Sequence, residues 1–276
     1  MRTLWMCLSL MAAEAEAQET REDAELGRAI ENTAAAGFAY HVRPVASIPD
    51  GFPQERLVLA GTPVVGTYTD GIYHARDGSY EIYRKGSRVA IRTEGGWLPL
   101  HQYTSPLRGD LAQAFDDRDG RLWRRGNVTA GRKALLQLIR IQHLDHRTNV
   151  GLLRKLGTAF VDLHAVESGR QGRVLEGDLA ETAAFGMLQG PYAALVERGT
   201  LAFRKPSGVG RVTIQDGLIR RILLKASGAY DYYQDADNVR RRGLCTLEIA
   251  IELTRHGEVR IDPPREVAHI LATEPE

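Results

Sequence analysis

Two histidines and an aspartate occur together in the segment His143-Leu144-Asp145-His146, and their side chains are of the types that bind metal ions. A structural zinc site uses four protein ligands and a catalytic zinc site uses three. The two histidines are three positions apart in an amphipathic segment, with no further ligand close by in the sequence. We therefore interpret them as two solvated histidines at a break between helices, and we expect neither a metal nor a cofactor.

A second cluster combines acidic and aromatic side chains that could bind calcium or a sugar. It comprises Tyr230, Asp231, Tyr232, Tyr233, Asp235 and Asp237. A calcium-binding loop of the helix-loop-helix type needs a central glycine and a distal glutamate. The spacing D-x-x-x-D-x-D provides neither of them. We therefore interpret this cluster as a solvent-exposed hairpin tip.

A cysteine and a basic run each allow a chemical and a structural interpretation. Cys245 could be a nucleophile, but it lies in an alternating apolar segment, where a small buried thiol is expected. The three arginines 240–242, with Arg124 and Arg125, could contact anionic headgroups. Short basic runs, however, usually form solvated loops, so the structural interpretation is favoured for both features.

Motifs that specify a reaction are missing from the sequence. It contains no G-x-S-x-G, no H-E-x-x-H, no phosphate-binding loop and no G-x-G-x-x-G. Gly208 and Gly210 are interpreted as turn residues in front of a strand. Because no nucleophile, base and orienting group can be assembled, we expect a protein that is not an enzyme.

The composition is that of a globular chain that can bury a core. The chain has 276 residues, of which 43% are hydrophobic and 26% charged, and it shows no repeat or linker that would divide it into separate domains. Its formal net charge is +1, so no overall field attracts nucleic acid or an anionic membrane. We expect no nucleic-acid partner.

The first 17 residues have the features of a secretory signal. Arg2 is followed by an apolar stretch from Leu4 to Ala13, and small residues permit cleavage after Ala15 or Ala17. The apolar stretch is too short to span a bilayer, which needs roughly 20 residues. We expect residues 1–17 to be removed and residues 18–276 to act in the periplasm or outside the cell. A disordered or helical N-terminal tail is the alternative.

Hydrophobic periodicity and turn residues predict an α+β fold. Apolar positions at helical spacing predict a helix over 19–36, ended by Gly37. Alternating segments predict strands at 38–44, 64–69, 72–75, 79–84, 88–93 and 97–100, then at 159–166 and 172–178, and finally at 200–205, 210–217, 218–232, 244–253 and 256–261. Helices are expected over 107–157 and, in two pieces, over 179–199.

The segment 244–253 indicates which face of the sheet is buried. Cys245, Leu247, Ile249, Ile251 and Leu253 share one face, and polar residues share the other. We predict a single large curved antiparallel sheet covered on its apolar face by several helices.

The order of these elements resembles that of the LolA and LppX/LprG group of bacterial envelope lipid and lipoprotein carriers. The run YEIYRKGSRVAIRTEGGWLPL and the ending LEIAIELTRHGEVRIDPPREVAHIL carry most of the resemblance. The resemblance implies an open half-barrel wrapped around helices, with an apolar cavity for acyl chains between them. It brings no catalytic signature with it.

We therefore expect an exported, non-enzymatic protein that holds a lipid or a lipoprotein acyl chain. Residues 133–156 are predicted to act as a lid over the cavity, and no segment is long enough to span a membrane, although peripheral contact with one is possible. The alternative is a structural or protein-interaction scaffold of the cell envelope with a filled core. The candidate cavity residues are Leu135, Leu138, Ile139, Leu152, Leu153, Leu247, Ile249 and Ile251.

Overall fold

The computed structural model describes the two halves of the sheet and five of the helices. The described residues are 21–47, 63–78, 80–115, 137, 151–169, 172–189, 196, 201–234 and 239–272. The predicted leader, His143 to His146, Arg124, Arg125, Asp235 and Asp237 lie outside them.

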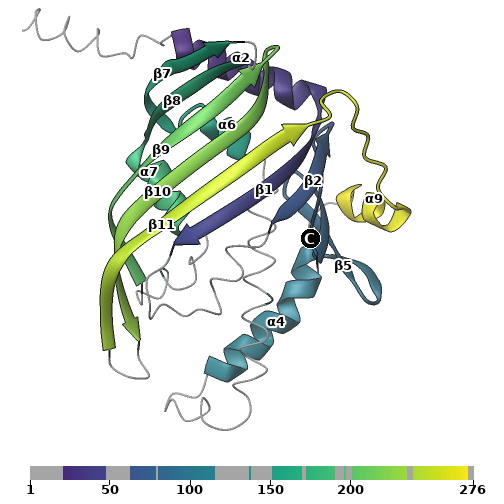
Figure 1. The fold of residues 1–276 in the computed structure, drawn as a ribbon. Helices are drawn as coiled ribbons and strands as arrows, with labels where there is room; N and C mark the ends of the chain where they lie inside the picture. Colours follow the sequence, from purple (N-terminus) through teal and green to yellow (C-terminus); the bar gives the residue numbers. More distant parts are fainter. Residues whose placement is uncertain are drawn as a thin grey trace, which may run out of the picture.

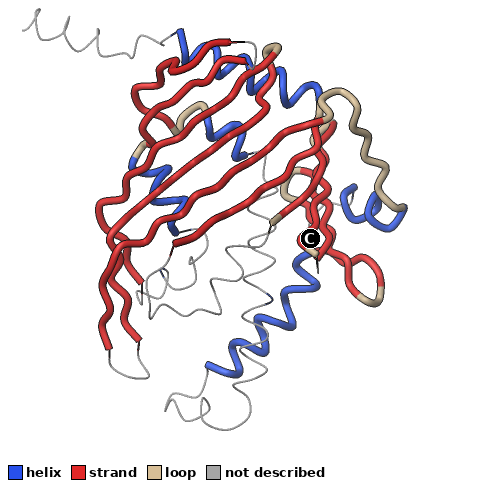
Figure 2. The backbone as a smooth tube through the Cα atoms, in the orientation of Figure 1, coloured by secondary structure: helices blue, strands red, loops and turns tan. Residues whose placement is uncertain are grey.

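A single antiparallel sheet of eleven strands dominates the fold, and it is open at both edges (Figures 1 and 2). The N-terminal half runs in the order β6-β5-β4-β3-β2-β1, and the C-terminal half continues it as β11-β10-β9-β8-β7. The strands are β1 (Phe38–Ser47), β2 (Val64–Thr69), β3 (Ile72–Asp77), β4 (Tyr80–Lys85), β5 (Arg88–Thr93), β6 (Gly96–Pro99), β7 (Phe160–Gly169), β8 (Gly172–Leu179), β9 (Leu201–Gln215), β10 (Leu218–Gln234) and β11 (Val239–Thr254).

Tight turns produce this meander in the way that the sequence predicts. Asp70 and Gly71 between β2 and β3, and Gly86 between β4 and β5, have the positive φ that two-residue hairpin connections require. The two halves are joined by pairing of the first strand with the last, with Tyr40 opposite Leu253 and Val42 opposite Ile251. The antiparallel sheet expected from the sequence is confirmed.

Five helices accompany the sheet in the described residues: α2 (Arg21–Ala36), α4 (Leu100–Phe115), α6 (Gly151–Leu156), α7 (Glu181–Gln189) and α9 (Arg265–Ala272). Helix α7 packs on β9, β10 and β11, whereas α4 packs on β5 and β6. Helix α2 lies across one end of the C-terminal half (Figure 1) and contacts β2, β7 and β10. In the described part of the chain, no helix is long and apolar enough to cross a membrane.

Burial confirms which residues of the segment 244–253, now part of β11, face inward. Cys245, Leu247, Ile251 and Leu253 are all buried in the main core, and Ile249 is partly buried against it. The same core receives Leu26 from α2 and Leu188 from α7. One face of β11 therefore belongs to the main apolar core.

Strand β9 corrects the interpretation of two glycines as turn residues. β9 is continuous from Leu201 to Gln215, and both Gly208 and Gly210 pair with β10 in its interior. A Cβ atom at Gly210 would lie 2.5 Å from Cε1 of Phe160 and 2.8 Å from Cδ2 of Leu224. Close packing of neighbouring groups, and not a turn, explains the glycine there.

The arginines at 240–242 are another correction, because they lie in β11 and not in a solvated loop. On the neighbouring strand β10, Tyr230 and Tyr232 are buried, although Tyr233 is exposed. The described residues of the predicted hairpin tip, 230–233, therefore lie in strand β10. The predicted strand 218–232 nearly coincides with β10, but the charged run concealed that β11 begins at Val239.

The C-terminus differs most from the sequence-based prediction. Residues 256–261 form no strand, and the chain continues into α9, which packs on β4, β5 and β6. Val267 and Leu271 of α9 form a second core with Tyr83 and Ala90. Because Ile82 next to Tyr83 belongs to the main core, both faces of the sheet are covered here. The expected single apolar face is wrong for this half.

Candidate ligand-binding site

The residues predicted to line a cavity divide into three groups. Leu153, Leu247 and Ile251 are buried in one continuous apolar core, with Ile249 partly buried against it. Leu152 lies in α6, and nothing is described of its side chain. Leu135, Leu138 and Ile139 lie outside the described residues. The sheet and α6 therefore contribute to a common apolar interior.

A cavity of about 800 Å³ lies at the ends of the hairpins of the N-terminal half. We call it the hairpin-end cavity. The turns after β3 and β5 form part of its wall, α4 adds a side chain, and residue 137 adds another. Its lining residues are Arg76, Gly78, Tyr80, Glu81, Arg92, Thr93, Glu94, Gly95, Tyr103 and Gln137.

Two tyrosines connect this cavity with the apolar interior. Tyr80 from the start of β4 and Tyr103 from α4 both line the cavity, and both are partly buried against the main core. A tyrosine has an apolar ring and a polar hydroxyl, so it suits a boundary between wet and dry surroundings. The cavity therefore lies where polar surface meets the core.

Glu81 is the best-organised charged group of the cavity. Its carboxylate contacts Nε2 of His74 at 2.7 Å and accepts a hydrogen bond from Arg92 at 2.8 Å. Burial raises the pKa of Glu81, but the hydrogen bonds and charges of Arg92 and His74 outweigh that effect, so the pKa lies below its ordinary value. His74 in turn stacks on Tyr83, with ring centroids 4.3 Å apart. The carboxylate is held ionised and fixed.

Arg76 has a different status from Arg92. Its position is directly opposite Glu81 in the register of β3 and β4, yet it is exposed and forms no ion pair with the residues that the structure describes. Among the described residues that line the cavity, Arg76 is therefore a cation available to an anionic group.

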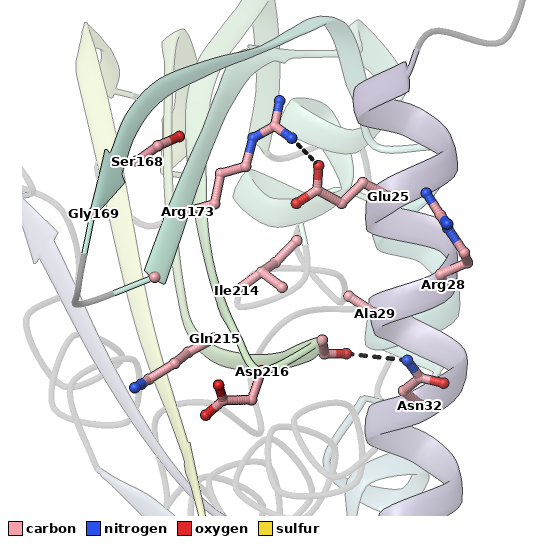
Figure 3. A pocket seen from close by; sticks show the side chains of 12 residues that line it. Glu25, Arg28, Ala29, Asn32, Ser168, Gly169, Arg173, Ile214, Gln215 and Asp216 are labelled. Atoms are coloured by element: carbon pink, nitrogen blue, oxygen red, sulfur yellow. Dashed lines mark hydrogen bonds and ion pairs between the residues drawn. The ribbon is translucent and has the colours of Figure 1, made fainter.

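A second cavity, of about 590 Å³, separates α2 from two hairpin turns of the C-terminal half (Figure 3). Arg173 of β8 reaches across to α2 and bonds to Glu25 at 2.5 Å and to Glu22 at 2.8 Å. Asn32 donates to the carbonyl oxygen of Gly217 at 3.3 Å. These bonds tie α2 to the sheet, so the polar groups of this cavity serve the fold first.

Nucleophilic and metal chemistry find no support in the described residues. Burial raises the pKa of the Cys245 thiol to about 11, so it is protonated at neutral pH and a poor nucleophile. No group of three metal-binding side chains occurs among the residues described. The expectation for His143 and His146 falls outside that part and remains a prediction.

Sequence reasoning missed the charged side chains of the hairpin-end cavity. A signal was available, because strict alternation in β3 and β4 places Arg76 and Glu81 on one face, across from each other. Tyr103 could not be found in this way, since the position of α4 depends on tertiary packing.

No family model matches the chain, and no curated protein is significantly similar to it. The interpretation of its function therefore depends on the residues and their arrangement.

Proposed function

We propose that the protein is an exported, non-catalytic binding protein that holds one amphiphile, with its acyl chain between sheet and helices. The observation that carries the proposal is the hairpin-end cavity of about 800 Å³. Ligand pockets are typically about 300 to 1,000 Å³ and combine an apolar lining with a few polar groups. Tyr80 and Tyr103 connect the cavity with the core, whereas the rest of its lining is polar, charged or glycine and suits the headgroup of such a ligand.

One residue of the predicted lid segment lines this same cavity. Gln137 lies within 133–156 and lines the cavity, and its sequence neighbours are Leu136 and Leu138. In our proposal, the apolar side of the segment faces the sheet when the site is empty and an acyl chain when it is loaded. The open sheet then acts as a half-barrel whose interior is shared by helices and ligand.

Burial of the acyl chain supplies the binding free energy in this scheme. Each methylene group transferred from water contributes about 0.8 kcal/mol. A chain of about a dozen carbons would therefore contribute roughly 10 kcal/mol, which can offset the cost of ordering a lid. Arg76 lies on the face of the sheet opposite the main core, near the hairpin end, so in this scheme it contacts the anionic end of the ligand where that end leaves the interior.

A scaffold with a filled core remains the second candidate. It is favoured by the burial of Leu153, Leu247 and Ile251 in a core shared with Leu156 and Leu188. Native interiors are packed to the density of organic crystals, so these side chains can fill one another's space without a ligand. Such a protein would offer a partner its sheet edges.

Binding of a fluorescent fatty acid separates the two candidates. The carrier proposal predicts saturable binding by the wild-type protein, and native mass spectrometry should show one bound molecule. Leu138→Asp and Leu152→Asp should abolish uptake more than they reduce folding, because each places a charge on the apolar side of the lid. No saturable binding, with a protein that is folded, would leave the scaffold candidate.

Charge reversal at the mouth of the cavity gives a matched pair of variants. Arg76→Glu should weaken binding of the fatty acid, since it replaces the free cation by an anion. Lys85→Glu makes the same change in charge at the far end of the same hairpin, outside the cavity lining. Equal losses in both variants would show that binding depends only on overall charge.

A further inference from the structure

Three arginines surround one aspartate on the outer face of the C-terminal half. Asp231 accepts two hydrogen bonds from Arg240, from Nε at 2.6 Å and from Nη2, and its Oδ2 lies 3.4 Å from Arg242 and 3.5 Å from Arg204. The arginine side chains are 55% to 66% exposed, whereas that of Asp231 is only 11% exposed. We call these four residues the arginine cluster.

Strand register places the cluster on the face opposite the main core. Arg242 is paired with Asp231 across β10 and β11, and Tyr230 and Tyr232 on either side of Asp231 are buried. The arginines therefore point away from the apolar interior. The segment lies at the end of the sheet remote from α2, where the β10–β11 hairpin projects (Figure 1).

The cluster has an excess of positive charge. A single carboxylate cannot neutralise three guanidinium groups, so the described cluster carries a net charge of +2. Including the charged residues next to the cluster in the sequence leaves this net charge of +2 unchanged. Lys205 and Arg241 add two cations, and Asp235 and Asp237 in the connection add two carboxylates. The excess is local, because the whole chain has a formal net charge of only +1.

Two apolar side chains are exposed beside the arginines on the same face. Leu244 is 62% exposed and stands two positions from Arg242 on β11, and Tyr233, directly opposite Arg240, is 42% exposed. Arginine pairs with phosphate in a bidentate manner. Tyrosine and leucine suit the boundary between headgroups and acyl chains. A nucleic-acid backbone offers no such apolar boundary to Leu244.

We propose that the arginine cluster, with Tyr233 and Leu244, docks the protein on the surface of a bilayer rich in anionic lipid. The arginines bind lipid phosphates, and the two apolar side chains enter the headgroup region. This surface lies apart from the hairpin-end cavity, so the proposal goes beyond the proposed function and does not require a bound acyl chain.

Flotation with lipid vesicles tests the proposal with the full chain. Wild-type protein should float with vesicles of equal parts phosphatidylglycerol and phosphatidylcholine, more weakly as salt is raised, and much less with phosphatidylcholine alone. Arg240→Gln with Arg242→Gln should lower the partition coefficient roughly 25-fold, since each basic residue near such a surface contributes roughly five-fold. Arg240→Lys with Arg242→Lys should retain most of the binding.

The matched control removes the same charge from the same face outside the cluster. Arg211→Gln with Arg221→Gln should leave flotation within about two-fold of wild type, because neither residue contacts Asp231 in the described structure. Both pairs keep the apolar N-terminal segment, so any vesicle binding by that segment cancels in the comparison. Thermal melts verify that all variants fold.

Three results would overturn the proposal. The first is an equal loss in the two double variants, which would indicate binding by diffuse charge. The second is displacement from vesicles by millimolar inorganic phosphate at constant ionic strength, which would indicate an ion site. The third is duplex DNA binding that depends on Arg240 and Arg242 while vesicles do not bind. High salt screens the contribution of the arginines. Weaker flotation of Leu244→Ser than of wild type under that condition would support the insertion of Leu244 into the headgroup region.

Discussion

At Gly208 the neighbouring strand occupies the space that a side chain would need. A Cβ atom there would meet the backbone carbonyl oxygen of Lys225, and Cδ1 of Leu179 at 2.8 Å. A backbone atom of a central strand cannot move without disturbing its ladder. The absence of a side chain at this position is therefore a packing requirement of the sheet, although the sequence made it look like a turn.

Gly208→Ala should lower the free energy of unfolding by about 1–3 kcal/mol, the usual cost of overpacking. Urea denaturation measures it. Gly186→Ala in α7 is the control, because a Cβ atom there meets nothing within 4 Å, and alanine is the better helix former by about 1 kcal/mol. If Gly208→Ala were as stable as Gly186→Ala, β9 would be interrupted where the structure shows it continuous.

His256 fixes the segment that leads from β11 to α9. Its Nδ1 lies 2.8 Å from Arg220, and its Nε2 lies 3.0 Å from the carbonyl oxygen of Ile219. An arginine can only donate, so Nδ1 accepts and Nε2–H donates, which requires the neutral ring. Burial lowers the pKa of His256, the charge of Arg220 lowers it further, and the bond to Ile219 opposes both effects.

Stability should therefore fall on mild acidification. Because the folded state holds the pKa of His256 below its ordinary value of about 6.5, the unfolded state binds the proton first. The contribution is present above about pH 6.5 and is lost as the pH falls through the folded-state pKa. Denaturation between pH 8 and 5 should show a decline in wild type that His256→Gln reduces. An identical slope in the two proteins would contradict the assignment.

At the scale of elements, β11 organises the molecule. It pairs with β1 on one side and with β10 on the other, and its inner residues alternate with Thr246, Glu248 and Glu252. The register is strongly specified, since a slip by one residue would exchange the two faces. This explains why the sequence pattern of one strand identified the buried side correctly.

Ile249→Asp should cost several kcal/mol of unfolding free energy, because it places a carboxylate against the apolar core. Glu248→Lys on the other face should cost less than about 1 kcal/mol, although it faces Lys225. Thermal melts of the two variants provide the comparison. The reverse order would mean that every inward assignment in this strand is displaced by one residue.

At the scale of the whole molecule, local patterns were sufficient for most strands and for the tight turns of the N-terminal half. The predicted ranges 64–69 and 88–93 coincide with β2 and β5. The errors occur where the environment of a residue decides its structure: the glycines inside β9, and the helix α9 that covers a second face. The lining of the hairpin-end cavity combines β3 with α4, which is distant from it in sequence, and no local pattern reports that proximity.

Export is a prediction for the whole chain. Expression with the complete N-terminus in a bacterium should give mature protein in the envelope that begins near Gln18, because small residues at 13, 15 and 17 allow cleavage there. N-terminal sequencing decides the matter. An intact Met1 on protein recovered from the envelope would contradict it.

The pairing of β1 with β11 means that the sheet cannot be fully assembled until the end of the chain has been synthesised. The two halves of the sheet meet at strands whose paired residues, such as Tyr40 and Leu253, are about three quarters of the chain apart. During synthesis, β1 and β2 would emerge long before the partner that protects the free edge of β1. Such a high contact order slows folding, and an uncovered edge invites aggregation. The nascent chain should therefore depend on a chaperone until its final fifth has been made.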